Sequence, residues 1–321
     1  MRILPGTAAP PDTAPVENSI AQLTDKLLTS YKEVGAINHL DGQNLPSKRV
    51  IVRITQELLC LLFPGFFEER PLRTDEVRAV TARRLRSVAT ALEREIHRSL
   101  VYLPPPEYPK KSLRPAARSI TLGLLESLPR LREILQTDIE AAYNGDPAAL
   151  SREEVILAYP FVETIAVQRL AHELYLAKVP LIPRMMTEWA HSRSGMDLHP
   201  GAQIGTHFFV DHCTGTVVGE TAIIGNHVKM YQGVGLVARS LAAGQALRGQ
   251  KRHPTIEDHV TIYAGATIMG GDTVVGAGST IGANVFLTTS VPPRSLVVQK
   301  DANIRVMSKG ERTRQEPDVQ I

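Results

Sequence analysis

Histidines that stand beside charged side chains gather in the second half of the chain, and such combinations can move a proton or hold a charged substrate. Three short polar strings carry them, at Asp197–Pro200, Asp211–Gly215 and Lys251–Pro254. An imidazole with a pKa near neutrality can take a proton from a hydroxyl group, and a carboxylate on its other nitrogen fixes its tautomer. A single histidine is more often structural than catalytic, so the strings count because each one combines a histidine with a charge.

These strings lie in a stretch of repeats that runs from about Asp197 to Pro293 and must position them. The repeat is six residues long, with an aliphatic residue followed by glycine, at Ile204-Gly205, Val218-Gly219, Ile224-Gly225, Val275-Gly276 and Ile281-Gly282. A six-residue apolar period fits neither an amphipathic helix nor a half-buried strand. It is typical of hexapeptide repeats, whose short parallel strands wind into a triangular β-helix.

The repeat also predicts which residues meet across coils. Three hexapeptides form one coil, so residues about eighteen apart lie above one another. Asp197 and His212 are fifteen residues apart, and they are therefore expected to face each other on adjacent coils. The segment 238–252 breaks the six-residue register, which predicts an excursion loop. It carries four cations, Arg239, Arg248, Lys251 and Arg252.

Before the repeats the apolar spacing is helical, so residues 17–193 are expected to form an all-helical domain. The expected helices cover 18–34, 48–62, 74–100, 116–128, 129–143, 161–176 and 183–192. Their apolar stripes exceed what one small bundle needs, so some stripes are expected to face another subunit.

The chain as a whole is therefore predicted to be α+β, with a helical N-terminal domain followed by a left-handed parallel β-helix over residues 194–295. Residues 1–16, which contain four prolines, are expected to form a flexible arm. Residues 296–321 are expected to be a C-terminal segment that ends in a polar tail.

Composition excludes several classes of protein. The net charge of +3 comes from mixed charges along 321 residues, which argues against a nucleic-acid-binding surface. No apolar run reaches the length of a membrane span, and the N-terminus lacks the apolar core of a secretory signal. The two cysteines, Cys60 and Cys213, are too far apart to indicate a disulfide framework. We therefore expect a cytoplasmic protein.

At the polar strings the sequence resembles the serine O-acetyltransferases, a family of hexapeptide-repeat acyltransferases. The resemblance covers roughly residues 130–295. It includes Asp138–Ala141, Gly145–Ala148, Asp197–Pro200, Asp211–Gly215, Val218–Ala222, Arg252–Pro254 and Ala264–Ala266. Single hexapeptides occur in many acyltransferases, but this ordered combination after a helical domain is specific.

The resemblance implies a role for each matching residue. His212 matches the general base and Asp197 the carboxylate that orients it. Asp146 and Asp211 match the pair that holds the amino group and hydroxyl of serine. Arg252 and His253 match the residues that hold the serine carboxylate. Gly235, Ala264 and Gly265 match residues that line the acyl-donor site.

The implied reaction is attack of the serine hydroxyl on the thioester of acetyl-CoA, a co-substrate, with no metal. The products are O-acetyl-L-serine and CoA. By the same resemblance we expect a homotrimer or a dimer of trimers. The chain ends in Ile321, and family members that end so insert this residue into O-acetylserine sulfhydrylase, which makes that enzyme a candidate partner.

This sequence departs from the family at several positions. Gly235–Arg239 reads Gly-Leu-Val-Ala-Arg where Thr-Leu-Gly-Gly-Thr is common, which affects the acyl-donor contacts. Cys213 stands where alanine is usual, and we interpret it as a small buried hydrophobic residue.

Three other functions remain open. An acyltransferase for amino sugars would share the repeats. A metalloenzyme like the γ-class carbonic anhydrases would bind zinc through histidines, and His207 and His212 have suitable spacing, but no third histidine is expected at a matching position. A non-catalytic scaffold would leave Asp146, Asp197, His212 and His253 without a use.

Overall fold

The computed structural model describes residues 14–240, 244–247 and 249–300. The arm expected over residues 1–16 lies mostly outside these residues, and its last three, 14–16, begin helix α1 (Ala14–Glu33). The polar tail at 301–321, with Ile321, also lies outside the described residues. Helix α1 and the short 3₁₀ helix η1 (Gly35–Ile37) belong to a unit of their own, which ends at Asn44.

The second unit begins at Leu45 with a helical region. Its helices are α2 (Lys48–Leu62), α3 (Val77–Tyr102), η2 (Lys110–Ser112), α4 (Leu113–Gly145), α5 (Arg152–Ala158), α6 (Pro160–Leu176) and α7 (Ile182–Ser194). They form because leucine, isoleucine and valine recur at helical spacing and are fully buried, as Leu58, Leu92 and Leu135 illustrate.

Helix α4 corrects the sequence analysis, which divided it into helices at 116–128 and 129–143. It runs unbroken through Pro129. Proline removes one hydrogen bond from a helix interior. However, Leu124, Leu128, Leu131 and Leu135 form one buried stripe across the proline, and packing of this stripe outweighs the local loss. The seven residues of α5, which were not anticipated, are too few to show a period.

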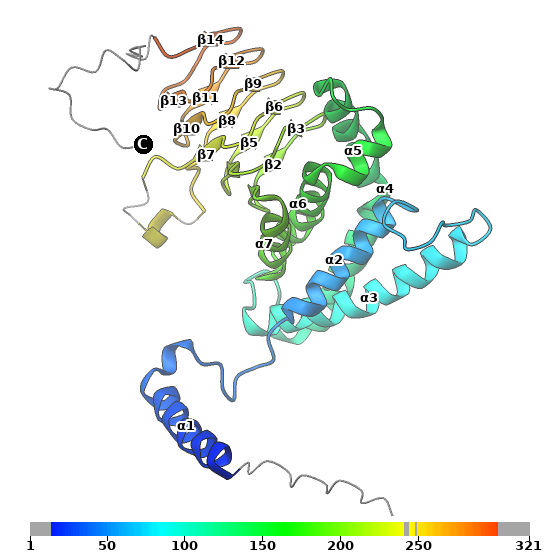
Figure 1. Cartoon of the computed structure of the whole chain (residues 1–321), viewed down its shortest axis with the longest axis vertical. Helices are drawn as coiled ribbons and strands as arrows, with labels where there is room; N and C mark the ends of the chain where they lie inside the picture. The colour runs from blue at the N-terminus through cyan, green and yellow to red at the C-terminus, as the bar shows by residue number, and fades with distance from the viewer. Residues whose placement is uncertain (1–13, 241–243, 248, 301–321) are drawn as a thin grey trace, which may run out of the picture. The chain divides into compact units, whose positions relative to one another are not determined.

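Short parallel strands follow, fourteen of them among the described residues, and they stack in three sheets. Figure 1 shows the successive coils that these strands form. Sheet A contains β1 (Asp197–Leu198), β4 (Val217–Val218), β7 (Gly235–Val237), β10 (Thr267–Met269) and β13 (Phe286–Leu287). Sheet B contains β2 (Gln203–Ile204), β5 (Ile223–Ile224), β8 (Thr255–Ile256) and β11 (Val274–Val275). Sheet C contains β3 (Phe209–Val210), β6 (Lys229–Met230), β9 (Thr261–Ile262), β12 (Thr280–Ile281) and β14 (Leu296–Val297).

The chain visits the sheets in the order A, B, C in each of the first four coils, so three kinds of corner join them, and the last coil passes from β13 of sheet A to β14 of sheet C. The A–B corners are residues 199–202, 219–222, 238–254 and 270–273. The B–C corners are 205–208, 225–228, 257–260 and 276–279, and the C–A corners are 211–216, 231–234, 263–266 and 282–285. The long A–B corner includes the 3₁₀ helix η3 (Gly244–Leu247).

Register explains the repeat. Leu198, Val218, Leu236, Ile268 and Leu287 occupy equivalent positions in sheet A, and each is at most 9% exposed. Glycine follows the aliphatic residue because the coils come very close there: a Cβ at Gly205 would lie 2.5 Å from the carbonyl oxygen of Gly225.

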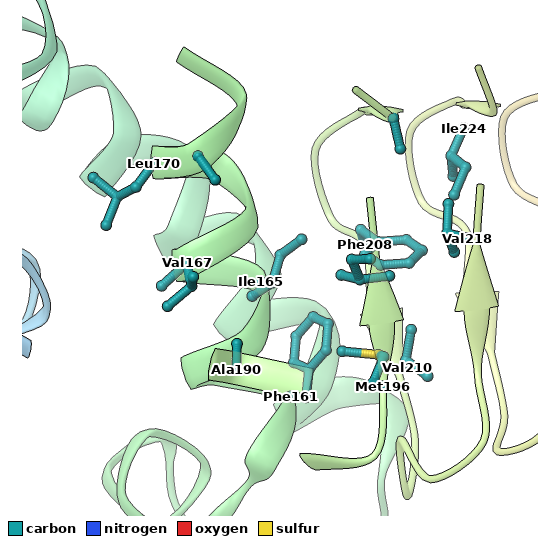
Figure 2. Close-up of a cluster of buried hydrophobic side chains, with 14 of the residues drawn as sticks. Phe161, Ile165, Val167, Leu170, Ala190, Met196, Phe208, Val210, Val218 and Ile224 are labelled. Carbon is teal, nitrogen blue, oxygen red and sulfur yellow. The ribbon is translucent and has the colours of Figure 1, made fainter. Parts of the chain in front are cut away.

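The helical region is joined to the first coil by a buried ion pair. Arg169 of α6 donates two hydrogen bonds of 2.8 and 2.9 Å to Asp138 of α4, and others to the carbonyls of Ile204 and Gly205. Asp138 also accepts from the backbone N–H of Phe208. Apolar side chains also join the helical region to the first coil: the ring centroids of Phe161 of α6 and Phe208 lie 6.1 Å apart. Figure 2 shows both residues in the buried hydrophobic cluster.

A helical region followed by a parallel β-helix is thus confirmed. Among the described residues, no helix combines the length and the apolar character that a membrane span requires.

Candidate active site

The first C–A corner differs from those above it by being longer. Val210 pairs with Met230 and Val217 with Gly235, so residues 211–216 occupy the place that residues 231–234 take in the next coil. Three of the six residues have left-handed φ values, Gly215 among them, and the values of 61° at His212 and 60° at Cys213 are uncommon for residues with a side chain. The extra length projects His212, whose side chain is 68% exposed.

Cys213 anchors this corner. Its side chain is buried and donates a weak hydrogen bond to the carbonyl of Val210, 3.6 Å away. Burial raises the pKa of the thiol to about 12, so the group stays protonated near neutral pH. It is therefore a packing residue, as the sequence analysis expected, and not a nucleophile.

Acidic groups from two regions lie in the surroundings of His212. Asp211 Oδ1 lies 3.7 Å from His212 Nδ1. Asp146, which caps the C-terminus of α4, accepts hydrogen bonds from the hydroxyl of Tyr159 and, at 2.9 Å, from the backbone N–H of Ala148. The Tyr159 hydrogen bond is the main reason why the pKa of Asp146 lies below its usual value, and the charge of His212 contributes. The structure thus brings Asp146, Asp211 and His212 into one region, and their roles toward a substrate stay predictions.

Asp197 has a different neighbour from the one that its spacing predicts. Its carboxylate lies 3.8 Å from Arg184 of α7, and no hydrogen bond or ion pair joins Asp197 to His212 in the described part of the chain. Arg184 also pairs with Glu188 at 2.5 Å. The ligand atoms of Glu188, His191 and Asp197 lie within 4.8 Å of one another, an arrangement that could hold a cation, but Arg184 already supplies positive charge there.

Arg252 and His253 end the excursion and lie at the A–B corner. The guanidinium of Arg252 pairs with Glu220, and Glu220 also accepts a 2.8 Å hydrogen bond from Tyr175 of α6. Glu220 of the β-helix thereby fixes one side of the Arg252 guanidinium, and Tyr175 ties Glu220 to the helical region.

The ring of His253 is buried and held in one tautomer. Its Nδ1 accepts a 3.0 Å hydrogen bond from the backbone N–H of Thr221, so the neutral ring carries its proton on Nε2. Burial, followed by the charge of Arg252, lowers the pKa of His253 to about 4. A Cβ at Gly219 would overlap this ring, so only glycine fits there. At neutral pH His253 can donate a hydrogen bond, but it supplies no charge.

The predicted substrate residues therefore form two groups rather than one. Asp146, Asp211 and His212 gather at the C–A corner, whereas Arg252 and His253 lie at the A–B corner, across the strands of sheet A. Within the described residues, no hydrogen bond or ion pair connects the two groups.

The predicted acyl-donor residues lie at or beside the C–A corners of later coils. Ala264 and Gly265 lie in the third coil, and Gly265 has a left-handed φ of 70°. Gly235 lies between Val217 and Thr267 on the outer face of sheet A, where a Cβ would make only ordinary contacts of 3.6 Å. The missing side chain therefore leaves a notch in this face.

The B–C corner corrects one point of the sequence analysis, because a third histidine does match His207. His207, His227 and His259 occupy equivalent places in successive coils, with ring centroids 4.0 and 4.6 Å apart. The rings are nearly parallel, at 21° and 6°. Stacked rings do not direct their nitrogens toward one common ion, so this stack differs from a zinc site.

Sequence reasoning assigned no role to Tyr159, Tyr175 or Glu220, although each contacts a predicted site residue or its partner. Glu220 lies within the string Val218–Ala222 that carries the family resemblance, which was a usable signal. Tyr175 lies in α6 and Tyr159 between α5 and α6, neither in a recognisable motif, and only the fold brings them to the corners.

The sequence of this chain is similar to those of known proteins. A search against protein-family models finds no match. The plasmid serine acetyltransferase of Synechococcus elongatus is 42% identical over 262 residues, which is 79% of this chain and 82% of that protein. This chain belongs to the serine acetyltransferase family. The serine acetyltransferase of Bacillus licheniformis is 44% identical over 126 residues, 39% of this chain and 56% of that protein.

Solved serine acetyltransferases share the fold. Isoform 3 from Entamoeba histolytica, in complex with cysteine, matches with a TM-score of 0.69 and 32% identity over 91% of this chain and 96% of that one. The enzyme from Neisseria gonorrhoeae, in complex with serine, matches with a TM-score of 0.51 and 26% identity over 83% of this chain and all of that one. The predicted fold class, with its left-handed β-helix, and the predicted family are thus confirmed.

Proposed function

We propose that this serine acetyltransferase family member transfers an acetyl group from acetyl-CoA to the hydroxyl of L-serine, giving O-acetyl-L-serine and CoA. The observation that carries this proposal is the cluster of Asp146, Asp211 and His212 at the lengthened C–A corner. Two carboxylates beside an exposed imidazole suit a substrate that bears both an ammonium group and a hydroxyl group.

His212 is the proposed general base. A serine hydroxyl becomes a competent nucleophile when a base removes its proton as it attacks the thioester carbonyl. The sulfur of CoA then leaves as the C–S bond breaks, and the proton held by His212 passes to it. Asp146 and Asp211 hold the substrate ammonium, and Asp197 orients His212 once it exchanges Arg184 for the imidazole. No step of this reaction requires a metal.

The substrate carboxylate is assigned to Arg252 and His253. Because these residues lie at a different corner from His212, we propose that the complete site joins the C–A corner of one subunit to the A–B corner of its neighbour in a homotrimer. The acyl donor would lie in the same groove, against the notch at Gly235 and along Ala264 and Gly265. Helical regions would pair two trimers where a hexamer forms.

The activity is tested by thiol release from acetyl-CoA with L-serine, L-homoserine, L-threonine and an amino sugar as acceptors. We expect turnover with L-serine and an acetylated product by mass spectrometry. Turnover with the amino sugar alone, or none with any acceptor, would contradict the proposal.

The shared site is tested by mixing two variants, His212→Ala and Arg252→Ala, each of which should be inactive alone. In mixed trimers, an intact His212 of one subunit meets an intact Arg252 of its neighbour, so co-expression should restore part of the activity. No recovery from mixtures that light scattering shows to be trimers would contradict a shared site, and a monomer at micromolar concentration would contradict the trimer.

Two further proposals concern regulation. L-cysteine, which differs from serine by sulfur in place of oxygen, would compete at the serine site, and inhibition that serine cannot relieve would argue for a separate site. The tail ending in Ile321 would bind O-acetylserine sulfhydrylase through its terminal carboxylate and side chain. Calorimetry with a peptide of residues 316–321 tests this, because a peptide ending in glycine should bind far more weakly.

A further inference from the structure

Tyr159 lies where the α5–α6 connection approaches the C–A corner. It ends α5 and immediately precedes Pro160, the first residue of α6. A residue before proline is disfavoured in helical conformation, and Tyr159 is accordingly extended, with φ −83° and ψ 119°. Its backbone N–H donates to the carbonyl of Val155, so the main chain on which the phenol is mounted is fixed.

The phenol completes the hydrogen bonding of Asp146. Oδ1 of this carboxylate accepts from the backbone N–H of Ala148, and Oδ2 accepts from the Tyr159 hydroxyl. With one donor on each oxygen, the carboxylate cannot rotate without losing a hydrogen bond. Each oxygen keeps a lone pair that can receive another donor.

The surroundings of Tyr159 are those of the proposed ammonium site. Asp211 lies close enough that its charge, after the hydrogen bond to Asp146 and burial, helps raise the pKa of Tyr159 to about 12. The phenol therefore keeps its proton throughout the working pH range. Its hydroxyl remains a donor to Asp146 and stays uncharged beside two carboxylates.

We infer that Tyr159 is a positioning residue that holds Asp146 in the orientation needed to bind the substrate ammonium, an inference that rests on the proposed function. The hydroxyl of Tyr159, and not only its ring, is the part that matters. Loss of the hydroxyl should weaken binding of ligands that carry the α-amino group, and it should leave the acyl donor unaffected.

The test is Tyr159→Phe, which removes one oxygen and keeps the ring. We expect the KM for L-serine to rise about ten-fold, the scale of one hydrogen bond to a charged group, with the KM for acetyl-CoA unchanged. The inhibition constant of L-cysteine should rise in parallel, because cysteine carries the same ammonium. That of 3-mercaptopropionate, which lacks the amino group, should stay at the wild-type value.

Tyr108→Phe is the matched control. The Tyr108 hydroxyl also donates one hydrogen bond, of 3.0 Å to the carbonyl of Ala177, but its partner belongs to the helical region and to neither substrate group. This variant should keep wild-type values of both KM and show only a small change in melting temperature. A merely structural role for Tyr159 predicts the same result for both variants.

The outcomes separate this inference from the proposed function. A wild-type enzyme that does not acetylate serine overturns both. An active wild type whose Tyr159→Phe variant keeps its KM for serine, or loses affinity for serine and acetyl-CoA alike, overturns the role of Tyr159 alone.

Discussion

The B–C and C–A corners of the β-helix both carry histidines whose backbone lies in the left-handed region, with φ between 55° and 61°. At the B–C corner the connections are regular, and His207, His227 and His259 stack on one another in successive coils. At the C–A corner the connection is two residues longer, and His212 projects beside Asp146 and Asp211 instead of beside another ring.

This difference shows at which positions of a repeating fold a side chain is available for a reaction. In the B–C stack, burial and the neighbouring rings lower the pKa of His227, so the neutral form is favoured and the rings serve packing. At the C–A corner the neighbour of His212 is a carboxylate, Asp211, 3.7 Å away, instead of another ring. Irregularity in the repeat, rather than the histidine itself, distinguishes the position that we propose to be reactive.

Removing one histidine from each corner should give the largest difference in activity between the two corners. His212→Ala should lower kcat by about two to four orders of magnitude, the usual loss for a general base. His227→Ala removes an equally left-handed histidine from the B–C stack and should keep kcat near the wild-type value. Thiol release measures both, and circular dichroism checks that each variant folds. Equal losses in the two variants would mean that the corners do not differ in function.

The B–C corner is also where the helical region is anchored, which predicts a large effect on stability. Arg169→Ala leaves Asp138 as an unpaired buried charge, so the free energy of unfolding should fall by about 3–5 kcal/mol. The control is Arg152→Ala, which breaks an exposed pair with Glu140 and should not change stability measurably. Urea unfolding compares the two, and similar midpoints would argue that the Asp138–Arg169 pair does not hold the helical region to the β-helix.

The A–B corner extends the comparison through a position where only glycine fits. Gly219→Ala would place a methyl group in the ring of His253 and displace it, so kcat/KM for serine should fall by about one to two orders of magnitude, the scale of a misplaced binding group. Gly123→Ala, at an open position on α4, should leave activity unchanged and add slightly to stability. Normal serine kinetics in Gly219→Ala would contradict a role for His253 in binding serine.

The smallest expected effect is the pH dependence of stability from the buried histidines. Burial lowers the pKa of His199 and of His253 to about 4, whereas both protonate near 6.5 in the unfolded chain. Between these values the unfolded state binds more protons, so stability is complete above about pH 6.5 and falls as pH decreases toward 4. Melting temperatures across this range should show the decline, and His253→Gln should reduce its slope. An identical slope in the variant would contradict this source.

The sequence was informative where the pattern is local and periodic. The alternation of aliphatic residues and glycine fixes the β-helix, because each coil repeats the same close approach. The strings around His212 and His253 supplied candidate site residues, and the family resemblance supplied the role predicted for each. Sequence spacing could not reveal that Asp197 faces Arg184, because α7 returns to the first coil by tertiary packing. Nor could it place Tyr159, which comes to Asp146 only through the turn between α5 and α6.

The excursion between Val237 and Thr255 has a consequence for how the protein can be changed. Strands β7 and β8 keep their pairing with the coils on either side, so the insertion leaves the solenoid undisturbed. Arg252 and His253 are held at its downstream end by the Thr221 hydroxyl, which accepts from both of their backbone N–H groups. Lengthening a flexible loop costs little extra closure entropy. The part of this excursion upstream of Leu247, whose carbonyl accepts from Arg252, is therefore a graft point. Peptides of different length or sequence can be exchanged there while Arg252 and His253, the proposed carboxylate-binding residues, stay in place.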